Sequence, residues 1–187
     1  ELVPIGTNAL VSQAVGAKDT NAAKHIGTLN LINSVLWGVI IAAIMIVLLP
    51  VLYNFTNLDT PKAVLANEFL FPILVLLPFV ILFETGSAIF RGHGNTQTPF
   101  RLLLMVFTLK SIISPLLIFT FDLGIRGASI ATMVSYGSVF MIELVLLKKH
   151  GLITSLKKKV DSIISETKFH WKVTRETIKI GLPLSLE

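Results

Sequence analysis

The sequence contains no cysteine, so it can form neither a disulfide framework nor a thiolate metal site. Charge is also scarce. Only 14% of the 187 residues are charged, and no charged residue occurs between Ile26 and Leu58. Soluble domains carry about a quarter of their residues as Asp, Glu, Lys or Arg. The shortage of charge therefore excludes an ordinary soluble domain.

Two further absences narrow the range of functions. No Gly-x-x-x-x-Gly-Lys-Ser/Thr segment is present, so the sequence has no loop of this kind to hold a nucleotide phosphate. The four histidines are isolated in polar segments far apart, which predicts no metal site: His25, His93, His150 and His170. We therefore expect neither an enzyme nor a bound cofactor.

What the sequence has instead is long apolar segments. Its mean hydropathy is +0.78, and a helix needs about 20 apolar residues to cross the hydrocarbon core of a bilayer. The pattern predicts an all-α polytopic membrane protein whose complete spans cover residues 31–53, 69–90, 102–121 and 127–147. Residues 1–17 resemble the end of one more helix, and residues 180–187 the start of another. We therefore expect the sequence to be a fragment of a longer protein, with 1–147 as its transmembrane bundle.

The distribution of Lys and Arg predicts the orientation in the membrane. Thirteen of them fall in one set of connections: Lys18, Lys24, Arg91, Arg101 and nine between Lys148 and Lys179. The opposite set holds only Lys62 and Arg126. Because cytoplasmic loops are rich in Lys and Arg, the first set is predicted to face the cytoplasm. The net charge of +5 thus indicates topology in the cell membrane and gives no support for nucleic-acid binding.

The polar segment 148–179 has an amphipathic pattern. Its apolar residues share one helical face beside a run of three lysines: Leu152, Leu156, Val160, Ile163 and Ile164. This pattern is typical of a cytoplasmic helix that lies on the anionic lipids of the inner leaflet. A solvated linker helix between two halves of a larger protein fits the pattern equally well.

Three motifs carry a resemblance to a known family. They are GTNALVSQAVGAKDTNAA at 6–23, FRGHGNTQTP at 90–99 and LGIRGASIATMVS at 123–135. In this order and spacing the sequence resembles the multidrug and toxic compound extrusion (MATE) family. Asn95 stands where the family usually has aspartate, and Lys18 where it has a second glycine. The resemblance implies part of the N-terminal six-helix lobe of a twelve-helix transporter, from late helix two to the start of helix seven.

Each of the last three complete spans carries one ionisable residue: Glu84, Lys110 and Glu143. A lysine at mid-membrane costs about 2.5 to 3.5 kcal/mol on insertion scales, so such groups face a cavity or one another. Glu84 and Lys110 lie about 10 Å and 13 Å along their helices from the cytoplasmic Arg91 and Arg101. We therefore expect Lys110 to pair with Glu84, or else with a carboxylate of helix one that lies outside this sequence. Glu143 precedes Lys148 by five residues, so we expect it to be shallow and paired with interfacial lysines.

Hydroxyl groups accompany these charges. Ser129, Thr132, Tyr136 and Glu143 form one stripe on the last span, and Lys110 and Ser114 another on its neighbour. Two stripes on adjacent helices predict a wet cavity. In the alternative, the hydroxyls only bond their own helices or join helices to one another.

The resemblance adds roles to the same positions. It implies that Lys110 and Ser114 occupy the places of an Asn and an Asp in helix five, just before Pro115. Glu84 and Thr132 occupy polar positions of helices four and six. The implied site is a substrate and ion cavity formed by Glu84, Lys110, Ser114, Thr132 and Tyr136. Because the helix-five carboxylate is replaced, the usual proton or sodium chemistry of this lobe is not implied.

The function implied is a secondary active antiporter. It would expel small organic, often cationic, compounds by alternating access, driven by H⁺ or Na⁺. Its partners would be membrane lipids and the remaining helices of the same transporter. The alternative is a flippase of the same superfamily for lipids or lipid-linked oligosaccharides, which Lys110 favours because such cavities are cationic. A non-transporting scaffold or receptor is disfavoured because it has no need of charge within the membrane.

Overall fold

The computed structural model describes residues 2–55, 60–154, 173–179 and 181. Its regular structure in these residues is helical, which confirms the all-α fold. The elements are α1 (Leu2–Gly16), α2 (Thr20–Phe55), α3 (Thr60–Gly92), α4 (Gln97–Pro115), the π-helical turn η1 (Leu116–Thr120) and α5 (Gly124–Lys149). A short helical segment over 173–179 follows.

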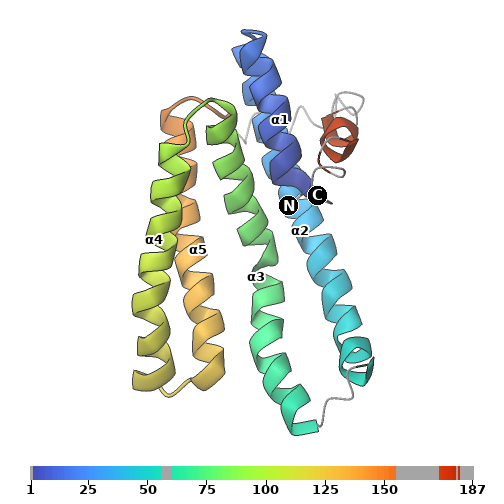
Figure 1. Cartoon of the computed structure of the whole chain (residues 1–187), viewed down its shortest axis with the longest axis vertical. Helices are drawn as coiled ribbons and strands as arrows, with labels where there is room; N and C mark the ends of the chain where they lie inside the picture. The colour runs from blue at the N-terminus through green and yellow to red at the C-terminus, as the bar shows by residue number, and fades with distance from the viewer. Residues whose placement is uncertain (1, 56–59, 155–172, 180, 182–187) are drawn as a thin grey trace.

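The long helices run up and down along one axis (Figure 1). The α1–α2 and α3–α4 connections and the end of α5 lie at one end of the bundle. The end of α2, the beginning of α3 and the α4–α5 connection lie at the opposite end. Among the described residues, Lys18, Arg91 and Lys148 are therefore separated from Arg126 by the length of the helices.

Four described segments are long and apolar enough to cross a membrane: Thr20–Tyr53, Val64–Gly92, Gln97–Thr120 and Gly124–Lys149. The predicted spans fall inside these helices except for Phe121, which lies one residue beyond η1, and α2 begins eleven residues before the predicted start at 31. Asp19 explains this early start, because its Oδ1 accepts a hydrogen bond of 2.9 Å from the backbone N–H of Ala22. Hydropathy marks only the apolar part of a helix, so it misses a polar first turn.

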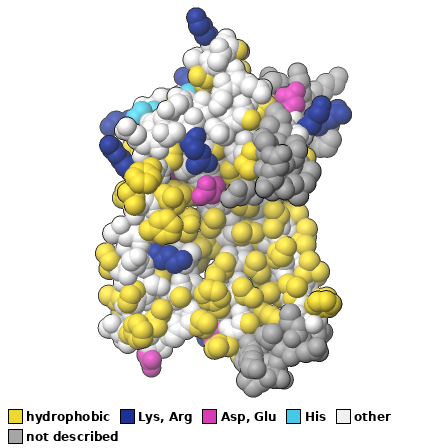
Figure 2. Space-filling view, in the orientation of Figure 1, with side chains coloured by type: hydrophobic (Ala, Val, Ile, Leu, Met, Phe, Trp, Pro, Cys, Tyr) yellow, Lys and Arg dark blue, Asp and Glu magenta, His cyan; other side chains and the backbone are white. Residues whose placement is uncertain are grey.

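The centre of the bundle is α3, which packs against α1, α2 and α5. One apolar cluster includes Phe83 of α3, Val106 of α4 and Val139 of α5. Side chains on the outer faces are also apolar, and a broad hydrophobic band covers the molecule below a charged upper end (Figure 2). Exposed apolar side chains on spanning helices are those that contact lipid in a membrane.

The segment expected to link the lobes is described only in part. Residues 155–172, which hold most of the predicted amphipathic face, lie outside the described residues, as do 182–187. The helical segment 173–179 packs against α2 through polar contacts. Asn33 Nδ2 donates to Thr174 Oγ1 at 3.0 Å, and Thr177 Oγ1 donates to Asn30 Oδ1 at 3.2 Å.

Candidate functional site

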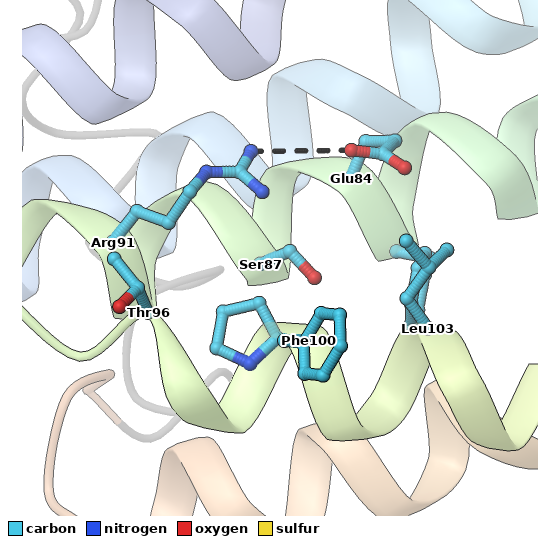
Figure 3. A pocket seen from close by; sticks show the side chains of 8 residues that line it. Glu84, Ser87, Arg91, Thr96, Phe100 and Leu103 are labelled. Atoms are coloured by element: carbon cyan, nitrogen blue, oxygen red, sulfur yellow. Dashed lines mark ion pairs between the residues drawn. The ribbon is translucent and has the colours of Figure 1, made fainter.

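A polar stripe on α3 forms the centre of the candidate site. Glu84, Ser87 and Arg91 are spaced by three and four residues, which places them on one side of the helix. Arg91 Nη2 lies 3.9 Å from Glu84 Oε2, so the two form an ion pair along α3, with Ser87 between them (Figure 3). Both side chains are more than a third exposed, so this pair contributes little to stability.

The Glu84–Arg91 pair lines two cavities. The first has a volume of about 230 Å³, and Pro99, Phe100 and Leu103 of α4 line it together with Ser87 (Figure 3). The second has a volume of about 540 Å³ and lies between α1, α2 and α3, with Trp37 among its mostly apolar lining. Apolar walls with a few polar groups are typical of sites for small organic molecules.

Glu143 of α5 lies against the same stripe. Its side chain is 0% exposed, and Ser87 Oγ donates a hydrogen bond of 2.8 Å to its Oε1. Its Oε2 has no hydrogen-bond partner among the described residues. The expectation that Glu143 is paired with interfacial lysines is therefore wrong, whereas its depth in the membrane stays a prediction.

Helical geometry explains the error. Five residues turn an α-helix by about 500°, so Lys148 points about 140° away from Glu143. Leu147, four residues on, shares the face of Glu143 and is equally buried, whereas Lys148 is exposed. Proximity in sequence therefore did not bring Glu143 and Lys148 together.

Gly86 of α3 makes room for the buried carboxyl group. A Cβ atom added at Gly86 would lie 2.6 Å from Oε2 and 2.7 Å from Cδ of Glu143. Real Cβ atoms essentially never approach another atom so closely. The absence of a side chain at this position therefore lets α3 and α5 pack with Glu143 between them.

The structure does not bring Lys110 to Glu84. Glu84 is paired with Arg91, and the side chain of Lys110, half-buried on α4, forms no ion pair within the part of the chain that the structure describes. Among the described residues, neither Lys110 nor Ser114 lines the two cavities that Glu84 borders. The expected pair of Lys110 and Glu84 is therefore not formed in this structure.

The predicted residues on α5 have close contacts within the protein. Thr132 Oγ1 donates to the carbonyl of Ala128 at 2.9 Å, and Ser129 Oγ donates to the carbonyl of Phe69 on α3 at 3.1 Å. The ring of Tyr136 meets that of Phe83 edge to face, with centroids 5.6 Å apart. These are the contacts of side chains that bond their own helix or join two helices. A cavity role for Thr132 and Tyr136 stays a prediction.

Sequence reasoning thus found Glu84 but missed Ser87, Arg91 and the burial of Glu143. A signal for two of the three was available, because Glu84, Ser87 and Arg91 share a helical face. No sequence pattern identifies Glu143 as the partner of Ser87, because this contact depends on how α3 and α5 are rotated against each other.

The structure explains the motif substitution at Asn95 but not the one at Lys18. Asn95 Oδ1 accepts a hydrogen bond of 3.0 Å from the backbone N–H of Thr98, so its side chain closes the beginning of α4 as a capping residue does. Lys18 has φ +60°, a conformation that favours the glycine usual at this position of the family.

Comparison with known proteins places this site in context. Multidrug export protein MepA of Staphylococcus aureus is 24% identical over 185 residues, which are 99% of this chain and 40% of MepA. A probable multidrug resistance protein, YpnP of Bacillus subtilis, is 26% identical over 132 residues, 70% of this chain and 28% of YpnP. A crystal structure of MATE in complex with MaD3S matches with a TM-score of 0.86 and 22% identity, over 99% of this chain and 40% of that one.

The chain therefore spans less than half the length of the relatives that it matches. The matched part of the solved MATE structures is their N-terminal lobe, which confirms the fold expected for this chain. The family model MatE matches residues 2–116, and the chain belongs to the MATE family of membrane transport proteins.

Proposed function

We propose that this chain forms part of a multi-pass exporter of small organic compounds in the cell membrane. The observation that carries the proposal is the Glu84–Arg91 pair, which lies within a spanning helix in the walls of two apolar cavities. A charged pair at this place has little structural value, and charge inside a membrane span marks a substrate or ion pathway. The relatives named as multidrug export or resistance proteins support the same function.

The proposed mechanism is secondary active antiport by alternating access, driven by H⁺ or Na⁺. The lobe supplies one wall of the pathway, and the remaining helices of the same transporter supply the others. An organic substrate places its apolar body against side chains such as Trp37 and Leu77, and a charged or polar group against Glu84 or Arg91. The names of the relatives favour export over the movement of lipids.

The experiment uses the intact protein in proteoliposomes with ethidium, a fluorescent organic cation, as the probe. Flux is measured with a pH gradient alone, with a sodium gradient alone, and after an ionophore has collapsed each gradient. The proposal expects ethidium flux that requires one of the two gradients and is absent from empty liposomes. Flux that is the same with and without either gradient contradicts antiport.

A second assay in the same vesicles follows the movement of a fluorescent lipid between leaflets. If the protein is an exporter of organic compounds, lipid should move between the leaflets at the same rate as in empty liposomes. Rapid lipid movement without ethidium flux would show a flippase and overturn the proposal.

A further inference from the structure

Glu143 is a buried acid that the export of an organic compound does not by itself require. It is 0% exposed, it receives one hydrogen bond, and its Oε2 has no partner among the described residues. A buried carboxylate anion needs a cation or several donors to offset the loss of hydration. One hydroxyl is a weak substitute for these, whereas a neutral carboxyl group needs far less. The surroundings of Glu143 therefore suit a carboxyl group that holds a proton.

The charged groups around Glu143 come from α3. Glu84 and Arg91 lie three residues before and four residues after Ser87, on the face of α3 that meets Glu143. The face of α4 in the shared core is apolar and includes Leu102 and Val106. Five other cations of α4 and α5 lie on side chains that are exposed or half-exposed: Arg101, Lys110, Arg126, Lys148 and Lys149. One guanidinium group, that of Arg91, thus stands near two carboxyl groups and is paired with Glu84.

Ser87 joins the buried acid to the cavity. Its hydroxyl group bonds Glu143, and its side chain also lines the 230 Å³ cavity between α3 and α4. Arg91 and Thr96, the residue that immediately precedes α4, line the same cavity (Figure 3). A proton can therefore pass between Glu143 and a water molecule in the cavity through one hydroxyl group.

We propose that Glu143 is a proton-binding site of this lobe and that Glu84 controls its occupancy by competing for Arg91. While Arg91 pairs with Glu84, Glu143 holds a proton. When Glu84 engages another cation, Arg91 turns to Glu143, which then releases the proton. The hydroxyl group of Ser87 first turns from Glu143 to a water molecule, so that its oxygen accepts the proton of Glu143 while its own proton passes to the water; the serine is unchanged and Glu143 is left as a carboxylate.

This inference deepens the proposed function, and its role in transport rests on that function. An organic cation that binds Glu84 would expel a proton from Glu143, which is the exchange that an antiporter needs. The proton site itself is tested without transport, so its failure and the failure of the proposed function are distinguishable.

The test is infrared difference spectroscopy of the intact protein in nanodiscs, titrated over pH. A protonated carboxyl group has a carbonyl stretching band that a carboxylate lacks. The wild type is expected to show a band that disappears on titration, and Glu143→Gln is expected to lack it. The control Glu68→Gln, which removes a carboxyl group paired with Arg126 at the opposite end of the bundle, keeps the band. Identical spectra for the wild type and Glu143→Gln overturn the proposal.

Ser87→Ala gives an independent reading if Glu143→Gln does not fold. It removes the hydroxyl group that bonds Oε1, so the band must persist but change frequency. Ser129→Ala, a serine whose hydroxyl group bonds α3 elsewhere, must leave the frequency unchanged. An unchanged frequency in Ser87→Ala overturns the assignment to Glu143.

A double substitution tests the competition for Arg91. Glu84→Gln frees Arg91, so the band should disappear at a pH about one unit lower, a tenfold change in proton affinity. Adding Arg91→Gln to Glu84→Gln should move the transition back toward that of the wild type. If the double variant behaves like Glu84→Gln alone, Glu84 acts only by direct repulsion, and competition for Arg91 is wrong.

Discussion

Gly86 on α3 and Glu143 on α5 face each other so closely that a single added carbon atom would collide with the carboxyl group. A Cβ at Gly86 would lie 2.6 Å from Glu143 Oε2. The close approach of α3 to α5 at this point encloses an acid that the sequence places near the end of a span. Ser87, which bonds this carboxyl group and lines the neighbouring cavity, connects the two.

Gly86→Ala is expected to destabilise the lobe. The added methyl group forces α3 and α5 apart or displaces Glu143, which costs about 1 to 3 kcal/mol in overpacked interiors. Thermal unfolding of the purified protein in detergent measures the effect. Gly137→Ala is the matched control on α5, because its Cβ meets nothing within 4 Å and alanine favours helix by up to about 1 kcal/mol. Equal stability of the two variants would contradict the packing described here.

Lys18→Gly is expected to stabilise the protein. Lys18 has φ +60°, and a left-handed residue with a side chain costs about 1 to 2 kcal/mol relative to glycine. The same thermal assay should show a higher unfolding temperature. Lys24→Gly removes an identical charge from within helix α2, where glycine costs about 1 kcal/mol, and should lower it. A lower unfolding temperature for Lys18→Gly would be inconsistent with this backbone conformation.

Lys110→Gln is expected to leave the amount of folded protein unchanged and to reduce transport strongly. No ion pair with a described residue is broken by the change, whereas a lysine within a span is costly and marks function. Size-exclusion chromatography gives the folded amount, and ethidium flux between pH 5.5 and 8.5 gives the activity. Unchanged flux over that range would show that Lys110 has no role in transport.

A double variant separates this account of Lys110 from a structural one. If Lys110 and Glu84 were paired in the folded protein, Lys110→Ala would lose folded protein and Glu84→Ala would restore it. Because Glu84 is paired with Arg91 instead, we expect no such rescue. A clear rescue would show that the two residues do pair.

The orientation of the bundle can be tested because the chain has no cysteine. Thr96→Cys and Leu123→Cys place single thiols at exposed positions in turns at opposite ends. An impermeant maleimide added to intact cells should label Leu123→Cys, and should label Thr96→Cys only after permeabilisation. The reverse pattern would place the Lys- and Arg-rich end outside the cell, against its composition.

The sequence predicted the helices well because apolar segments of membrane length have few alternatives. A chain that crosses lipid must satisfy its backbone groups internally, so length and hydropathy determine both element type and number. The boundary at Thr20 was missed because Asp19 and the polar first turns of α2 carry no hydropathy signal.

The side-chain partners were less predictable, for a geometric reason. Counting residues along a helix gives the depth of a side chain but not the direction in which it points. Depth alone predicted that Glu84 pairs with Lys110 and that Glu143 lies beside Lys148. The actual partners depend on the rotation of α3 against α5, which small residues such as Gly86 permit and which no local pattern reveals.

The most direct test of the whole account is the gradient-driven flux of ethidium by Glu84→Gln. Glu84 borders both cavities, and the proposals above assign it both substrate binding and the control of proton release. Glu68→Gln is the control, since Glu68 pairs with Arg126 at the opposite end of the bundle. At equal amounts of folded protein, the account predicts that Glu84→Gln loses flux by about tenfold or more, a change of ~1.4 kcal/mol in the barrier, while Glu68→Gln retains it. Wild-type flux in Glu84→Gln would contradict the central role given to the α3 stripe.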